Sequence, residues 1–64
     1  MNRKEVKVEI NKCTIDELKA WRKHAVNCLN YYLKYPDDFE IEECKFIITH
    51  IDERLMDIQI KNKH

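Results

Sequence analysis

Glycine and serine are both absent from this chain of 64 residues, and each absence excludes a class of functional site. At the usual abundance of roughly 7%, a chain of this length would contain about four or five glycines. Nucleotide-binding phosphate loops, dinucleotide-binding turns and EF-hand calcium loops all require glycine at fixed positions, so none of them is encoded here. The absence of serine excludes a serine nucleophile in the same way.

Charge of one sign is not in excess either, because 12 Lys and Arg residues balance 12 Asp and Glu residues. General binders of nucleic acids or membrane surfaces are usually basic, so we expect neither as a partner. No apolar run reaches the ~18 residues of a membrane helix, and no signal-peptide segment follows the N-terminus. The sequence therefore predicts a cytoplasmic protein whose three cysteines (Cys13, Cys28 and Cys44) are free thiols.

The first patterned segment, residues 5–10 with the sequence EVKVEI, alternates charged with β-branched side chains. This alternation is typical of a half-buried strand, in which successive side chains face opposite sides of the backbone. Val6, Val8 and Ile10 would then share one apolar face. We therefore predict a β-strand over residues 5–10.

A helix is predicted next, over residues 14–35. Thr14 and Glu17 have the spacing of a capping box, which satisfies two backbone N–H groups at a helix start. Nothing interrupts the helical pattern before Pro36. Because the residue before a proline disfavours helical geometry, the helix should end there.

A turn over residues 36–39 separates this helix from a second one over residues 40–60. Asp37 or Asp38 can cap the second helix, since an aspartate accepts hydrogen bonds from the free N–H groups of a helix start. So short a turn forces the two helices to run antiparallel. We assign residues 1–64 to a single, mostly α domain that combines an N-terminal β-strand with an antiparallel αα-hairpin.

Apolar residues recur at steps of three and four in both helices, which is the spacing of a heptad stripe. In an antiparallel hairpin the two stripes pair without any shift, and a small residue, Ala25, faces a large one, Ile48. The agreement between stripes, turn and caps supports the hairpin. The predicted layers are Tyr32–Ile41, Cys28–Cys44, Ala25–Ile48, Trp21–Ile51 and Leu18–Leu55.

Apolar surface is left over in this arrangement, because the apolar arc of the first helix is wider than one partner helix can cover. The predicted strand also has no pairing partner in its own chain. Homodimerisation into a four-helix bundle would satisfy both. In the alternative, a monomer folds its strand over the first helix. The predicted oligomer interface comprises Val6, Val8, Ile10, Val26, Leu29, Leu33 and Ile47.

Metal-ligand side chains come together at one place in the predicted hairpin, where His24 and Cys28 lie near Cys44. Zinc prefers four nitrogen or sulfur ligands, and the fourth is missing. We therefore interpret these residues as core and predict no metal and no other cofactor. A nucleophilic thiol must be exposed in an electropositive environment, whereas Cys28 lies on a face that we expect to be packed. We expect the protein not to be an enzyme.

Aromatic and acidic side chains gather around the predicted turn, a composition found in protein interfaces. The acids alternatively serve only to complement the dipole of the second helix. The leading hypothesis is a small protein-interaction module with an unidentified protein partner. The small size and the abundance of Lys, Ile and Asn suggest a phage or mobile-element regulator or inhibitor of a host protein. The predicted interaction surface comprises Tyr31, Tyr35, Phe39, Phe46, Asp37, Asp38, Glu40, Glu42 and Glu43.

The stretch KEVKVEINKCTIDELKAW resembles the strand and the start of the first helix of ribbon-helix-helix repressors. The resemblance implies a DNA-binding dimer whose outward strand residues, here Glu5, Lys7 and Glu9, face the DNA major groove. Two acids at these positions disfavour DNA, because electrostatic attraction dominates its binding. A third hypothesis is a sponge for small anionic ligands, held between protomers by Lys, Arg and Tyr. Phosphate contacts of the DNA-binding alternative would come from Arg3, Lys4, Lys7, Lys12, Arg22 and Lys23.

Overall fold

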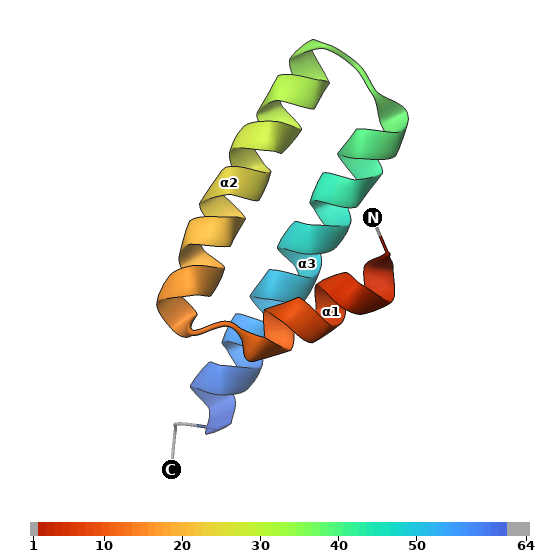
Figure 1. Cartoon of the computed structure of the whole chain (residues 1–64). Helices are drawn as coiled ribbons and strands as arrows, with labels where there is room; N and C mark the ends of the chain where they lie inside the picture. The colour runs from red at the N-terminus through yellow and green to blue at the C-terminus, as the bar shows by residue number, and fades with distance from the viewer. Residues whose placement is uncertain (1, 62–64) are drawn as a thin grey trace.

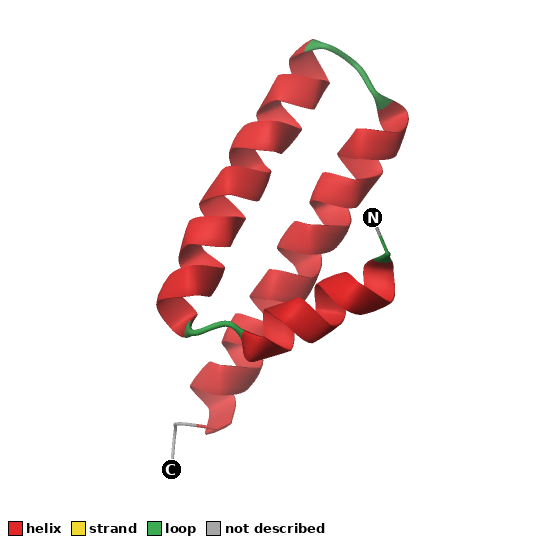
Figure 2. Ribbon diagram, viewed as in Figure 1, coloured by secondary structure: helices red, strands yellow, loops and turns green. Residues whose placement is uncertain are grey.

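The computed structural model describes residues 2–61 and places them in three helices (Figures 1 and 2). The helices are α1 (Arg3–Lys12), α2 (Ile15–Lys34) and α3 (Asp38–Lys61). α2 and α3 lie side by side and antiparallel, while α1 crosses one side of α3 (Figure 1). The result is an elongated molecule of 44 × 20 × 15 Å. Within the described residues, no helix has the length and apolar character that crossing a membrane requires.

The β-strand predicted over residues 5–10 is wrong, because these residues belong to α1. The described part of the chain contains no strand that could pair with this segment, so an extended conformation would leave its backbone groups unpaired. A helix satisfies those groups internally. It also buries Val6 and Ile10, which are four residues apart, and turns Val8 outward to 50% exposure.

The two helices of the predicted hairpin are present, and their ends differ from prediction by no more than two residues. α2 starts after the N-cap Thr14, and α3 starts after Asp37, whose Oδ1 accepts a hydrogen bond from the Glu40 N–H at 3.1 Å. Asp37 is therefore the cap of α3. Between α1 and α2 only Cys13 and Thr14 intervene, and both have extended backbone angles that need no glycine.

The capping box of α2 makes the fold less stable at acid pH than at neutral pH. The Thr14 N–H donates to Glu17 Oε1 at 2.9 Å, and hydrogen bonding from Thr14 lowers the pKa of the Glu17 carboxyl. A lowered pKa means that the ionised carboxyl stabilises the fold above its unfolded-state pKa and stops doing so as the pH falls through the folded-state value.

We expect Glu17→Gln to lower the melting temperature at pH 7, and we expect this effect to disappear as the pH falls below the lowered pKa of the Glu17 carboxyl in the fold. Thr14→Ala removes the other half of the box and should cost about 1 kcal/mol of unfolding free energy at pH 7. Thermal unfolding of both variants and the wild type, followed by circular dichroism across this pH range, measures these differences. A Glu17→Gln deficit that does not change with pH would contradict the assignment.

The core is small and is formed by all three helices. Leu18 of α2 and Ile51 of α3 are both 0% exposed, and α1 adds Val6 and Ile10 to the same cluster. Arg22 and Asp52 form an ion pair across α2 and α3, with Nε and Oδ1 2.6 Å apart. This pair fits the predicted register, in which the neighbouring Trp21 and Ile51 share a layer.

The residues of the predicted oligomer interface fall into two sets. Val6 and Ile10 are buried because α1 packs against α3, and Ile47 is buried in the same core cluster. The other four positions are half-buried or exposed, so the chain leaves this part of its apolar surface open. They are Val8, Val26, Leu29 and Leu33.

Candidate interaction site

Three aromatic side chains are exposed where α2 meets α3. Tyr31 and Tyr35 are each 57% exposed and Phe39 is 63% exposed. The rings of Tyr31 and Tyr35 contact each other, with centroids 5.1 Å apart. Because so much apolar area faces solvent at one end of a small fold, this end is a candidate for binding. We call these three residues, with Asp37 and Asp38, the turn surface.

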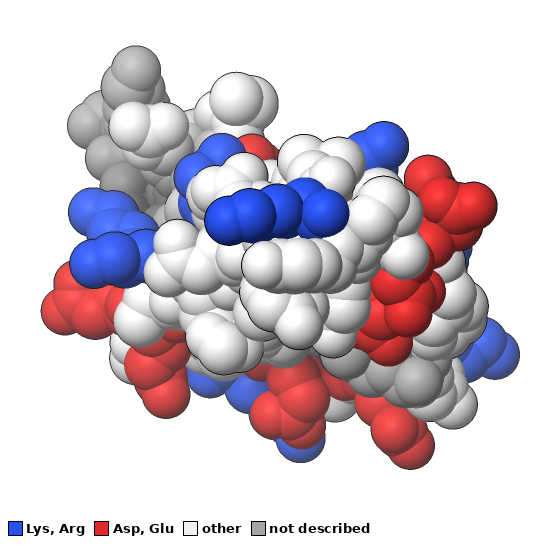
Figure 3. All heavy atoms as spheres, turned by 90° about the horizontal axis from the view of Figure 1, so that it is seen from above, with Lys and Arg blue, Asp and Glu red and all other residues white. Residues whose placement is uncertain are grey.

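Charge on the turn surface is mainly negative. Asp37 and Asp38 are exposed, whereas the basic Lys34 lies over the ring of Tyr35, with its Nζ 5.7 Å from the ring centroid. Glu42, the next exposed acid along α3, pairs with Lys45, with Oε1 and Nζ 3.9 Å apart. Figure 3 looks down on this end and shows a mostly uncharged area that a basic side chain crosses, with carboxylates on several sides of it. Aromatic and acidic side chains are therefore both exposed at the turn.

Two predicted members of the interaction surface lie elsewhere. The Phe46 ring is half-buried beneath Arg3, whose Cζ is 4.5 Å from the ring centroid, and contacts His50. Glu43 is 7% exposed and is paired with Arg3, with Nη2 and Oε1 3.3 Å apart. Arg3 of α1 contacts both residues, and the strand prediction for this segment did not indicate these contacts.

A cavity of about 280 Å³ lies between α2 and α3, and two predicted acids, Glu40 and Glu43, line it. Glu40 raises the pKa of Tyr32, and burial of the phenol raises it further. Cys28 Sγ lies 3.5 Å from His24 Nε2. The full lining is Trp21, His24, Ala25, Cys28, Tyr32, Glu40, Glu43, Cys44 and Ile47.

The buried cysteine of this cavity, Cys44, is a thiol in surroundings that do not activate it. Burial raises the pKa of the Cys44 thiol, and nearby Cys28 raises it further. A raised pKa lowers the fraction of nucleophilic thiolate at neutral pH. Among residues 2–61, no group of three or more His, Cys, Asp or Glu side chains is arranged to hold a metal ion.

A second hollow, of about 260 Å³, lies between α1 and α3 and carries both signs of charge. Lys7, His50 and Arg54 line it together with Glu53 and Asp57. The buried Nε of Arg54 has no hydrogen-bond partner among the described residues, but the Arg54 side chain is partly exposed. Mixed charge gives this hollow no preference for a ligand of either sign.

Comparison with family models, with curated proteins and with solved structures finds no match to this chain. A functional assignment therefore depends on the geometry described above.

Proposed function

We propose that this protein is a non-enzymatic protein-interaction module that binds another protein through its turn surface. The supporting observation is the group of three aromatic side chains, each more than half exposed, at one end of the hairpin. Tyrosine and phenylalanine supply large contact areas at little entropic cost, which makes them frequent anchors of protein interfaces.

The charge around these anchors indicates the chemistry of the partner. Asp37 and Asp38 are exposed on the same turn surface, so a complementary surface would carry Lys or Arg around an apolar centre. Such steering accelerates association at low salt. A phage or mobile-element regulator or inhibitor of a host protein is the form of this function that we favour.

The proposal is tested by replacing Tyr35 with a photo-crosslinking phenylalanine analogue in cells that naturally make the protein. The same analogue at Ile60 is the control, because Ile60 is 63% exposed at the other end of α3. We expect one discrete protein adduct at position 35 and none at position 60. Equal labelling at both positions, or none at Tyr35, would contradict the proposal.

The adduct partner is then purified and its affinity measured with Tyr35→Ser and Phe39→Ser variants. Each substitution removes an exposed anchor and should weaken binding by about 2 kcal/mol, or roughly 30-fold. Ile60→Ser serves as the matched control and should bind as the wild type does. Unchanged melting temperatures would show that the losses arise at the interface. Wild-type affinity in both turn variants would exclude the turn surface as the contact.

Self-association is a second expectation that the open apolar positions support. Leu33 is 58% exposed, and Val26 and Leu29 lie half-buried on the same helix. We propose that a second copy covers this row, and light scattering on the same samples reports the mass.

The alternative functions have less support. A ribbon requires the strand that is here a helix, and the acidic lining of the α2–α3 cavity disfavours an anionic ligand there.

A further inference from the structure

Glu43 has a feature that the fold alone does not explain. Its side chain is only 9% exposed, and its Oε2 has no hydrogen-bond partner among the described residues. An unpaired buried carboxylate oxygen is costly, and such atoms in folded proteins usually have a ligand, ion or water beside them. Glu43 also lines the cavity between α2 and α3, so a ligand in that cavity is a candidate partner.

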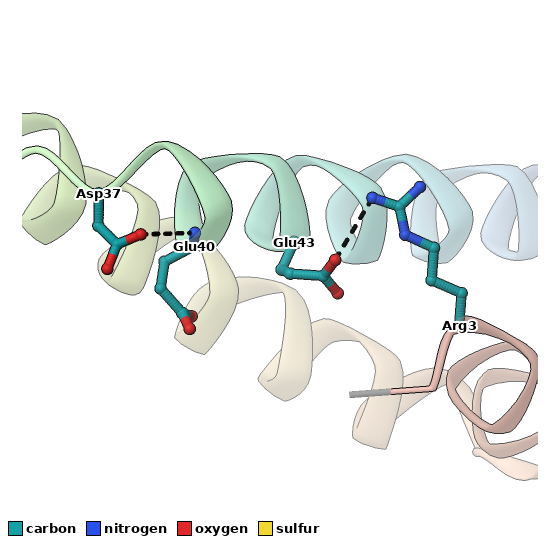
Figure 4. Close-up of polar contacts among 4 residues, drawn as sticks. All are labelled: Arg3, Asp37, Glu40 and Glu43. Atoms are coloured by element: carbon teal, nitrogen blue, oxygen red, sulfur yellow. Dashed lines mark hydrogen bonds and ion pairs between the residues drawn. The ribbon is translucent and has the colours of Figure 1, made fainter.

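The other oxygen of Glu43 already binds a guanidinium group. Arg3 reaches across from α1 and donates from Nη2 to Oε1 at 3.3 Å (Figure 4). The same guanidinium lies over the ring of Phe46, with 4.5 Å between Cζ and the centroid. Carboxylate and aromatic face thus recognise one organic cation from within the chain. Glu43 and Phe46 therefore show that side chains beside the cavity can bind a guanidinium group.

The cavity itself has the same composition. Trp21 and Tyr32 supply aromatic walls, and Glu40 supplies a second carboxylate beside Glu43. Figure 4 shows the Glu40 and Glu43 side chains extending from the same side of α3. Neither Lys nor Arg is among the described residues that line the cavity, and Arg3, which pairs with Glu43, reaches it from outside that lining.

We propose that this cavity binds an alkylguanidinium or alkylammonium group. Glu43 Oε2 and the Glu40 carboxylate are the counter-charges, while Trp21 and Tyr32 enclose the alkyl stem. A volume of about 280 Å³ is just below the roughly 300 Å³ at which pockets for drug-sized ligands begin, so the ligand is the size of a side chain.

The test is a titration of the whole chain, labelled with ¹⁵N, with butylguanidinium, followed by NMR. Butylurea is the neutral isostere and is titrated in parallel. We expect saturable shifts at the Trp21 indole and at the amides of Tyr32, Glu40 and Cys44 with the cation, and about tenfold weaker binding of the urea. Equal binding of the two compounds would overturn the proposal, because the cavity would then recognise only the alkyl chain.

Two substitutions at the Arg3–Glu43 pair have opposite expected effects. Glu43→Gln keeps the shape but removes the charge, and should weaken butylguanidinium binding about tenfold, whereas Glu53→Gln, at an exposed position of the same helix, should have no effect. Arg3→Gln keeps Glu43 and frees its Oε1, and should strengthen binding about threefold. If Glu43→Gln proves unable to fold, Arg3→Gln still tests the proposal. Weaker or unchanged binding of butylguanidinium to Arg3→Gln would overturn it.

Titrations with two peptides identify the source of the cation, and a zinc titration tests the main rival ligand. A capped peptide with arginine between two apolar residues should bind at least as tightly as butylguanidinium, and its citrulline counterpart should not. About tenfold tighter peptide binding assigns the pocket to a side chain of another protein, and equal binding assigns it to a free organic cation. Zinc that shifts the same residues, displaces butylguanidinium and fails to bind Cys28→Ser and Cys44→Ser variants would overturn the proposal.

Discussion

Replacement of Ile51 by alanine is expected to remove most of the free energy of unfolding of this protein. Ile51 is 0% exposed and belongs to the cluster that joins all three helices. An Ile→Ala change in a core costs about 2 to 5 kcal/mol, because the lost transfer energy adds to that of a cavity. A core in a chain of this size rarely supplies more than about 3 to 5 kcal/mol. The variant should therefore be largely unfolded at 25 °C.

Urea-induced unfolding followed by circular dichroism at the helix band measures this loss. Ile60→Ala is the matched control, since it makes the same chemical change on the same helix at a position that is 63% exposed. Its unfolding free energy should stay within about 0.5 kcal/mol of the wild type. Similar midpoints for Ile51→Ala and Ile60→Ala would contradict a core centred on Ile51.

The α2–α3 hairpin could be predicted because its signals are local and agree with one another. Thr14 and Glu17 determine the start of α2, and their capping box forms as the spacing indicates. Pro36 falls in the turn that follows α2. Heptad stripes on both sides of this turn then leave a single register, which the Arg22–Asp52 pair fits. Each signal involves neighbours in sequence or the direct consequence of a short turn.

α1 could not be predicted in the same way, because two periodicities coincide in its sequence. Val6 and Ile10 are spaced by four, which suits one helix face, but with Val8 between them they also form a strand pattern. β-branched residues favour a strand locally, and tertiary packing overrides that preference. The helix-start signal was nevertheless present, since the Asn2 side chain caps α1 by accepting from the Lys4 N–H at 2.9 Å.

The same error explains which members of the predicted interaction surface lie elsewhere. Tyr31, Tyr35 and Phe39 lie beyond the end of the core, so their exposure follows from the hairpin alone. The surroundings of Phe46 and Glu43 depend on α1, and Arg3 contacts both. A pairing across 40 residues of sequence has no local signal. It could be expected only once α1 was known to be a helix lying against α3.

The helical state of α1 makes a prediction that separates it from a strand residue by residue. Ile10→Ala should cost about 2 to 4 kcal/mol and Val6→Ala about 1 to 2 kcal/mol, since both side chains are buried against α3. Val8→Ala should cost nothing, because Val8 is 50% exposed and alanine favours a helix by about 0.5 kcal/mol over valine. Urea unfolding of the three variants measures these values. A strand would place all three side chains on one face and make all three changes costly, so a Val8→Ala loss comparable to that of Val6→Ala would contradict a helical α1.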